Sequence, residues 1–159
     1  MSIKNFEFCG KLLGQGQPTF IVAEVGFNHN GDVEWAKRMI ESAAENGANA
    51  VKLQTFIAKE MISNSLMADD PDNPGNEIPF YEFFQRYELT RSDYEILFAH
   101  AKKINIPLFS TPFDEASLEM LVELGTPAIK IASPDLIYLP FLKKVAKTSL
   151  PVVLSTGMG

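Results

Sequence analysis

The 159-residue sequence has a single cysteine, no long apolar run and fewer basic than acidic side chains. The lone Cys9 excludes an internal disulfide framework and fits a reducing compartment. No apolar stretch reaches the roughly 18 residues of a membrane span, and the first residues lack the apolar core of a signal peptide. We therefore expect a cytoplasmic protein that does not cross a membrane.

The chain has 14 Lys and Arg residues against 20 Asp and Glu residues, a net charge of −6. This shortage of positive charge argues against a nucleic-acid-binding surface. It leaves open a small anionic ligand, because a pocket in an acidic protein can be locally positive. With 46% hydrophobic residues, the chain is long enough for one domain with a substantial core.

Strand-type apolar segments alternate with helical stripes along most of the chain. Residues 1–18 contain a predicted short hairpin, and residues 19–159 contain five predicted strands separated by four helices. The strands are expected within residues 19–26, 49–55, 107–111, 127–133 and 151–156. Short acceptor side chains that cap helix N-termini occur at Asp32, at Thr90 with Asp93, and at Asp114.

This alternation of strands and helices predicts a parallel α/β sheet. Two architectures remain open at this point, an open doubly wound sheet and a (β/α)8 barrel. A barrel usually needs about 250 residues, so length alone favours the open sheet.

Residues 56–89 follow neither the helical nor the strand period. They contain an acidic loop at 68–76 and an aromatic segment at 80–84 that includes Tyr81. Because they come directly after a strand, they begin at the C-terminal face of the sheet, where long loops build active sites. We predict a lid over the strand ends, and the alternative is a disordered insertion.

Charged residues interrupt three of the apolar strands, at Glu24, Lys52 and Lys130. Alternate residues of a strand face opposite sides, so their apolar neighbours pack on helices while these three point into a common interior. Further polar residues stand at the C-terminal strand ends, where ligands bind in parallel α/β folds: Gln54, Thr55, Ser110, Thr111, Ser133, Ser155 and Thr156.

Two lysines in one interior favour binding of a multiply charged anion, a phosphate, a carboxylate or both. The alternatives are a buried Lys–Glu pair that serves only stability and a Schiff-base lysine. His29 either caps the following helix or touches a substrate, and His100 is interpreted as structural. No spacing in the chain resembles a metal site.

At these residues the sequence resembles the N-acetylneuraminate (sialic acid) synthase family, which includes pseudaminic and legionaminic acid synthases. The matching segments cover nearly the whole chain: Ile21–Gly26 with Asn28–Gly31, Val51–Thr55, Phe109–Phe113, Lys130–Ser133 and Leu154–Met158. The resemblance reverses the preference based on length. It implies the N-terminal part of a (β/α)8 barrel, with about five strands and a hairpin at its base.

The resemblance also implies a reaction, in which phosphoenolpyruvate condenses with an open-chain amino sugar such as N-acetylmannosamine or its 6-phosphate. Catalytic roles fall on Glu24, placed for proton transfer or water activation, and on Lys52 and Lys130. Positions that match binding of phosphoenolpyruvate also include Thr111, Ser133 and Ser155, and positions on the sugar side are Gln54, Tyr81 and Phe113. Many members have Gly-Ser-Gly-Glu where this chain has Ala-Ser-Pro-Asp, so Asp135 keeps a shorter carboxylate.

A divalent metal, usually manganese, is part of the implied chemistry, but the two histidines that bind it lie beyond the fifth strand and are not in this chain. We therefore expect a truncated barrel that is inactive alone and that forms a homo-oligomer or pairs with the missing half. Two alternatives are a catalytically silent anion-binding or assembly module and another phosphoenolpyruvate-dependent synthase of 3-deoxy sugar acids.

Overall fold

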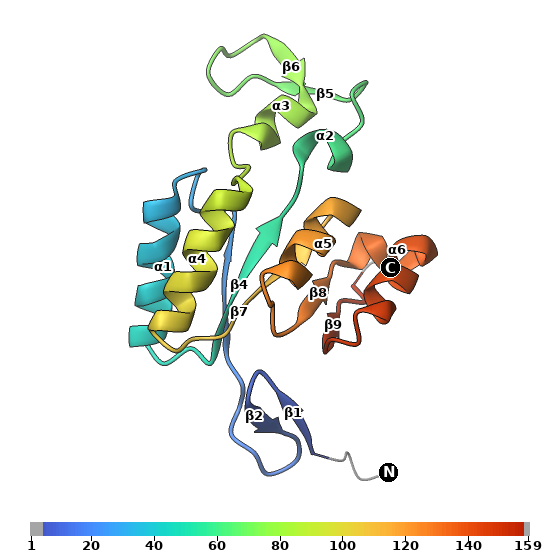
Figure 1. Ribbon diagram of the computed structural model, residues 1–159. Coiled ribbons are helices and arrows are strands. Elements are labelled where there is room, and N and C mark those ends of the chain that lie inside the picture. The colour runs from blue at the N-terminus through green and yellow to red at the C-terminus, as the bar shows by residue number, and fades with distance from the viewer. Residues whose placement is uncertain (1–4, 158–159) are drawn as a thin grey trace.

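The computed structural model describes residues 5–157, which are built around a five-stranded parallel sheet (Figure 1). Its strands are β3 (Val22–Gly26), β4 (Ala50–Thr55), β7 (Leu108–Pro112), β8 (Ile129–Ile131) and β9 (Val152–Leu154). They pair in the order β3-β4-β7-β8-β9, so each strand adds to the edge left by the one before it. A doubly wound sheet would instead put the first strand in the middle. The order is that of a barrel, and the preference based on length is wrong.

Helices cover one face of this sheet (Figure 1). They are α1 (Val33–Glu45), α4 (Arg91–Lys103), α5 (Glu115–Glu123) and α6 (Leu139–Lys147). The sheet residues beneath them include Val51, Leu53, Ile129 and Ile131, all with no exposed surface. The opposite face is therefore the interior side of the partial barrel, as the strand alternation predicts.

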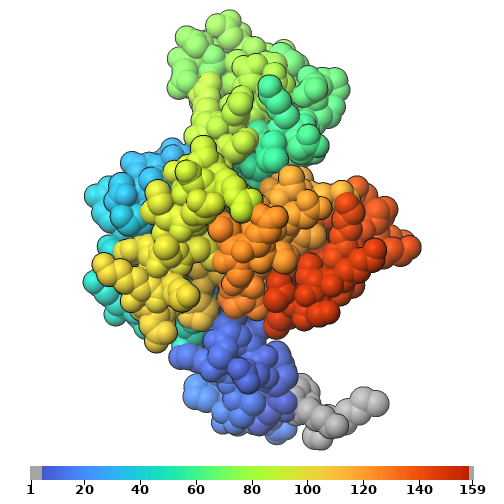
Figure 2. Space-filling model, viewed as in Figure 1, coloured from blue at the N-terminus to red at the C-terminus, as the bar shows by residue number. Residues whose placement is uncertain are grey.

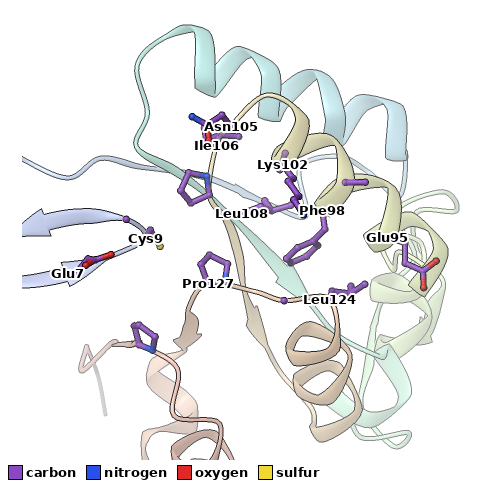
Figure 3. Close-up of a pocket in the computed structure, with 16 residues that line it drawn as sticks. Glu7, Cys9, Glu95, Phe98, Lys102, Asn105, Ile106, Leu108, Leu124 and Pro127 are labelled. Carbon is purple, nitrogen blue, oxygen red and sulfur yellow. The ribbon is translucent and has the colours of Figure 1, made fainter.

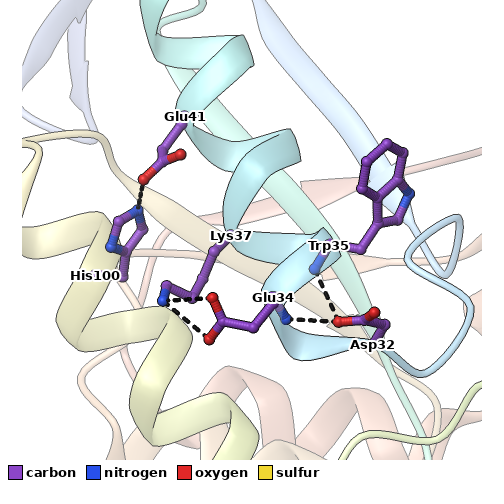
Figure 4. Close-up of polar contacts among 6 residues, drawn as sticks. All are labelled: Asp32, Glu34, Trp35, Lys37, Glu41 and His100. Atoms are coloured by element: carbon purple, nitrogen blue, oxygen red, sulfur yellow. Dashed lines mark hydrogen bonds and ion pairs between the residues drawn. The ribbon is translucent and has the colours of Figure 1, made fainter.

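Three of these helices begin where short acceptor side chains predict. The Asp32 carboxylate accepts hydrogen bonds from the N–H groups of Glu34 and Trp35 at the start of α1 (Figure 4). Thr90 and Asp93 form a reciprocal capping box at α4. Asp114 accepts from the Ser117 N–H at α5. Each cap pairs backbone donors that the first helical turn leaves free.

His100 joins α4 to α1, which agrees with its structural interpretation. Its Nε2 atom lies 3.0 Å from Oε1 of Glu41, without hydrogen-bond geometry (Figure 4). Both residues lie on the helical layer, outside the interior face of the sheet.

A hairpin closes the amino-terminal end of the interior, at the bottom of Figure 1. It consists of β1 (Phe6–Phe8) and β2 (Lys11–Leu13), joined by a turn at Cys9 and Gly10. Phe8 is 6% exposed and packs edge-to-face against Phe109, with ring centroids 5.9 Å apart. Burial raises the pKa of the Cys9 thiol to about 11.

Residues 56–89 contain regular structure that the sequence pattern does not predict. They form α2 (Ala58–Met61), an antiparallel pair β5 (Met67–Asp69) and β6 (Glu77–Pro79), and α3 (Phe80–Gln85). The segment stands beyond the carboxyl-terminal end of β4 (Figure 1) and projects from the main body (Figure 2). Its predicted location at that end of the strands is confirmed.

The two edges of the sheet expose apolar side chains. Ile21 is 56% exposed beside β3, and Val152 and Leu154 in β9 are 44% and 46% exposed. Neither the outer edge of β3 nor that of β9 pairs with another strand of residues 5–157. No helix in this described part of the chain is long and apolar enough to cross a membrane.

Candidate functional site

The register of the parallel strands brings the predicted charged residues together on the interior face. Glu24 in β3 stands opposite Lys52 in β4. Two residues further along β4, Gln54 stands opposite Thr111 in β7. Lys130 comes from β8, the next strand of the sheet. The interior position that strand alternation predicts for these side chains agrees with the apolar core on the other face.

Lys52 is the centre of the contacts. Its Nζ atom lies 2.5 Å from Oε2 of Glu24 and donates a hydrogen bond of 3.2 Å to Oγ1 of Thr111. The Lys52 side chain is 14% exposed, whereas that of Glu24 is 47% exposed. The ammonium is thus held inside while its carboxylate partner lies at the open side.

Lys130 has a different environment, because its Nζ atom donates to the carbonyl oxygen of Ile131 at 2.5 Å. No acidic side chain within residues 5–157 lies at ion-pair distance from it. Burial and the charge of Lys52 lower the pKa of Lys130, against the opposing effects of Glu24 and Asp135. The two ammonium groups therefore lie close enough to repel each other, a cost that an anion between them would relieve.

Asp135 lies in the short 3₁₀ helix η1 (Ser133–Ile137) that follows β8. Its Oδ2 atom is buried and has no hydrogen-bond partner among the described residues. Burial raises the pKa of Asp135, and the charge of Lys130 opposes that rise. Buried polar atoms without a partner are rare in folded proteins, so this oxygen marks a point where a ligand or a water would complete the hydrogen bonding.

The remaining predicted residues follow the strand ends. The Phe113 N–H donates to Thr55 after β7, and the Ser155 N–H donates to Ile131 after β9. Tyr81 lies on α3, where the Nζ atom of Lys59 stands 5.5 Å from the centre of its ring. No hydrogen bond or ion pair within residues 5–157 joins Tyr81 to the lysines of the interior, and its closeness to them stays a prediction.

Two residues support this end of the sheet: His29, which the sequence predicts as a cap or a substrate contact, and Tyr94, which the sequence does not single out. His29 is 1% exposed, its Nδ1 accepts from the Gly31 N–H, and its Nε2 has no partner in the described part of the chain. Burial lowers the pKa of His29, so the ring is neutral and braces the turn after β3. Tyr94 donates its buried hydroxyl to the carbonyl oxygen of Gln54 at 3.0 Å and fixes the end of β4. No local sequence period marks either contact.

The described residues of this chain do not make a metal centre by themselves. In the range 5–157, no three His, Cys, Asp or Glu side chains gather where they could hold an ion. The two carboxylates of the interior, Glu24 and Asp135, stand beside lysines, whose positive charge disfavours a second cation.

A separate cavity of about 850 Å³ lies at the other end of the strands (Figure 3). It opens between the hairpin, α4 and the turn after α5, and its apolar walls include Phe98, Leu108, Leu124 and Pro127. None of the predicted site residues lines it. Charge and hydrogen-bonding capacity therefore identify the carboxyl-terminal strand ends, rather than this cavity, as the candidate site.

The sequence profile of the NeuB family matches residues 39–159. The chain belongs to the NeuB family. It is 44% identical over 142 residues to an N,N'-diacetyllegionaminic acid synthase of Campylobacter jejuni, a match that covers 88% of this chain and 42% of that protein. It is 34% identical over 156 residues to N-acetylneuraminate-9-phosphate synthase of Mus musculus, with coverage of 97% and 44%. The family that the sequence motifs predict is confirmed.

Comparison with solved structures agrees with this family and with the barrel fold. A sialic acid synthetase from Leptospira borgpetersenii superposes on this NeuB-family chain with a TM-score of 0.84 at 32% identity, over 98% of this chain and 50% of that one. A 3-deoxy-D-arabino-heptulosonate 7-phosphate synthase from Thermotoga maritima gives a TM-score of 0.67 at 14% identity, over 99% and 48% of the two chains, a likeness of fold alone. The chain spans about 40% of the length of the curated relatives it matches.

Proposed function

We propose that this chain forms the N-terminal part of the catalytic barrel of a nonulosonic acid synthase. The enzyme would condense phosphoenolpyruvate with an open-chain amino sugar of the N-acetylmannosamine type and release phosphate. The observation that carries the proposal is the meeting of Lys52, Thr111 and Lys130 from three successive strands beside one carboxylate, Glu24. Relatives named as synthases of sialic and legionaminic acids support the reaction class.

Phosphoenolpyruvate suits this group of side chains because it carries a phosphate and a carboxylate. Lys52 and Lys130 would bind these charges, with the hydroxyls of Thr111, Ser133 and Ser155 as further donors. Cations and dipoles already fixed by the strands stabilise negative charge that develops on the substrate, at little reorganisation cost. The Leptospira relative was solved with citrate, another multiply charged carboxylate.

We assign the sugar side of the proposed site to Gln54, Tyr81, Phe113 and Asp135. Asp135 would accept a hydrogen bond from the sugar through its unpaired Oδ2 atom. Glu24 would transfer the proton or activate the water that the condensation needs. The resemblance implies that a divalent metal polarises the aldehyde. Since residues 5–157 do not fit a metal by themselves, no step assigned to them passes through one.

A second candidate function is an anion-binding or assembly module without catalysis. The exposed apolar residues at both edges of the five-stranded sheet favour it, because an open barrel offers surface for another chain. A synthase of 3-deoxy sugar acids, the third possibility, has support only from likeness of fold.

Isothermal titration with phosphoenolpyruvate tests the anion site. Lys130→Ala should weaken binding by roughly 1.5–3 kcal/mol, the usual loss for a charge-assisted hydrogen bond. Lys143→Ala, which removes the same charge from an exposed position of α6, should leave affinity unchanged. Equal affinity of the wild type and Lys130→Ala would refute the assignment.

A further inference from the structure

The ammonium of Lys52 already has two partners inside the protein, Glu24 and Thr111. A lysine ammonium has three N–H donors, and Thr111 already takes one of them. An anion that binds this ammonium must also share it with a carboxylate whose Oε2 atom lies 2.5 Å from the Nζ atom. Glu24 has no other cation at ion-pair distance within residues 5–157. An anion bound by Lys52 would therefore have the carboxylate of Glu24 as its nearest negative charge.

The charged and polar side chains around Glu24 come from β4, β7, β8 and η1. Lys52 in β4 and Lys130 in β8 are positive, Asp135 in η1 is acidic, and Gln54 and Thr111 are neutral. A phosphate or carboxylate placed between the two lysines brings new negative charge beside Glu24. Like charges at such distances favour the protonated form of a carboxyl group.

The backbone next to Glu24 leaves room for its side chain to move. The register of β3 with β4 is irregular between Glu24 and Gly26, and Gly26 has a φ of +58°. A Cβ atom at Gly26 would lie 3.2 Å from Oε1 of Glu24, so glycine keeps this space open. The side chain is also 47% exposed, which places its carboxylate at the solvent side of the group.

We propose that Glu24 is an internal competitor for Lys52: an incoming anion takes the ammonium from the Glu24 carboxylate, and Glu24 takes up a proton from solvent as it is displaced. This inference rests on the proposed function, because the anion is phosphoenolpyruvate. It adds an order of events. Glu24 meets the bound substrate as a carboxylic acid, and can give its proton to a reacting oxygen before it acts as a base.

Titration of the full chain with phosphoenolpyruvate, for the wild type and for Glu24→Gln, tests the proposal. Glutamine keeps the size of the side chain but cannot compete as an anion. The affinity of Glu24→Gln for phosphoenolpyruvate should therefore be about tenfold higher than that of the wild type at pH 7, equivalent to about 1.4 kcal/mol. Glu34→Gln removes the same charge from an exposed ion pair on α1 and should leave affinity unchanged. Far-ultraviolet circular dichroism checks that each variant is folded.

The proton is counted by repeating the titrations at pH 6 in buffers of different ionisation enthalpy. Protons that the ligand and Lys130 take up or release contribute to both titrations, so they cancel in the difference between the wild type and Glu24→Gln. The wild type should therefore take up more protons on binding than Glu24→Gln. Affinity of the wild type, relative to Glu24→Gln, should also increase as the pH falls from 7 to 5. Equal or weaker binding by Glu24→Gln, or equal proton uptake, overturns the competition. Failure of wild type and Glu24→Gln alike to bind would instead overturn the anion site and the proposed function.

Discussion

The two ends of β4, β7 and β8 have opposite chemistry. At the amino-terminal end, Ala50, Phe109 and Ala128 pack under Phe8 of the hairpin and exclude water. Two residues further along each strand, the interior contains Lys52, Thr111 and Lys130, with Glu24 of β3 beside Lys52. A step of two residues along β4 or β7, from Ala50 to Lys52 and from Phe109 to Thr111, leads from side chains that stabilise the fold to side chains that can bind charge.

This division has an energetic reason. Burial of aromatic and aliphatic surface at the base stabilises the sheet, at about 25 cal/mol per Å² of apolar area. Two lysines held close together at the other end reduce stability, because both lose hydration and repel each other. Stability lost at functional sites is common, since groups placed for a ligand lack their best partners in the protein. The following predictions separate the two layers.

The largest expected effect concerns activity. A barrel of this kind needs eight strands, and the described sheet has five with exposed apolar edges at β3 and β9. We expect residues 1–159 alone to show no synthase activity with phosphoenolpyruvate, N-acetylmannosamine and manganese, a deficit of orders of magnitude in rate. Phosphate release is the measurement, and release above that of a Glu24→Ala control would contradict this expectation.

Phe109→Ala should cause the largest loss of stability, because Phe109 is 1% exposed at the centre of the base layer. Removing a buried phenylalanine side chain costs about 3–5 kcal/mol of the free energy of unfolding. Urea denaturation measures the change. Phe6→Ala makes the same substitution at a hairpin position that is 54% exposed and should cost far less. Similar losses for both variants would show that the hairpin does not seal the base as described.

Tyr94→Phe should have an intermediate effect at the boundary of the polar layer. It removes the buried hydroxyl that donates to the carbonyl oxygen of Gln54. The expected loss is about 1–2 kcal/mol of the free energy of unfolding. Tyr138→Phe, on a tyrosine that is 49% exposed, serves as the control in the same denaturation series. No loss for Tyr94→Phe would mean that the contact does not hold the end of β4.

Lys130→Met should have the smallest effect and the opposite sign. Burial and Lys52 lower the pKa of Lys130 in the folded state, so the unfolded chain holds that proton more readily. The resulting penalty is complete below the lowered pKa and disappears as the pH rises to the ordinary lysine range. Lys130→Met should therefore be more stable than the wild type at pH 7, by a margin that shrinks toward pH 10. Lys143→Met controls for the lost charge, and a loss of stability in Lys130→Met at pH 7 would contradict the prediction.

Much of the fold follows from local sequence signals. The five strands, the main helices and the caps at Asp32, Thr90 and Asp114 are confirmed, because period and capping chemistry act over a few residues. The strand order depends on contacts between segments far apart in the sequence, which local signals do not give. Length alone therefore favours the open doubly wound sheet, which is the wrong architecture. Only the family resemblance predicts the barrel.

The site divides in the same way. Strand alternation predicts that Glu24, Lys52 and Lys130 share one interior, but it cannot give their partners, because register depends on neighbouring strands. The elements of residues 56–89 have three to six residues each, too few to show a period. Tertiary contacts fix them instead, such as the edge-to-face packing of Phe84 on Phe27 and the ion pairs of Arg86 with Asp70 and Asp72.

The central claim is that the carboxyl-terminal strand ends bind a multiply charged anion between two lysines. A crystal structure of this chain with phosphoenolpyruvate tests it most directly. We predict oxygens of the ligand at about 2.7–2.9 Å from the Nζ atoms of both Lys52 and Lys130. Phosphoenolpyruvate bound elsewhere at saturating concentration, for example in the cavity beside the hairpin, with Lys52 still paired only to Glu24 and Thr111, would contradict the account.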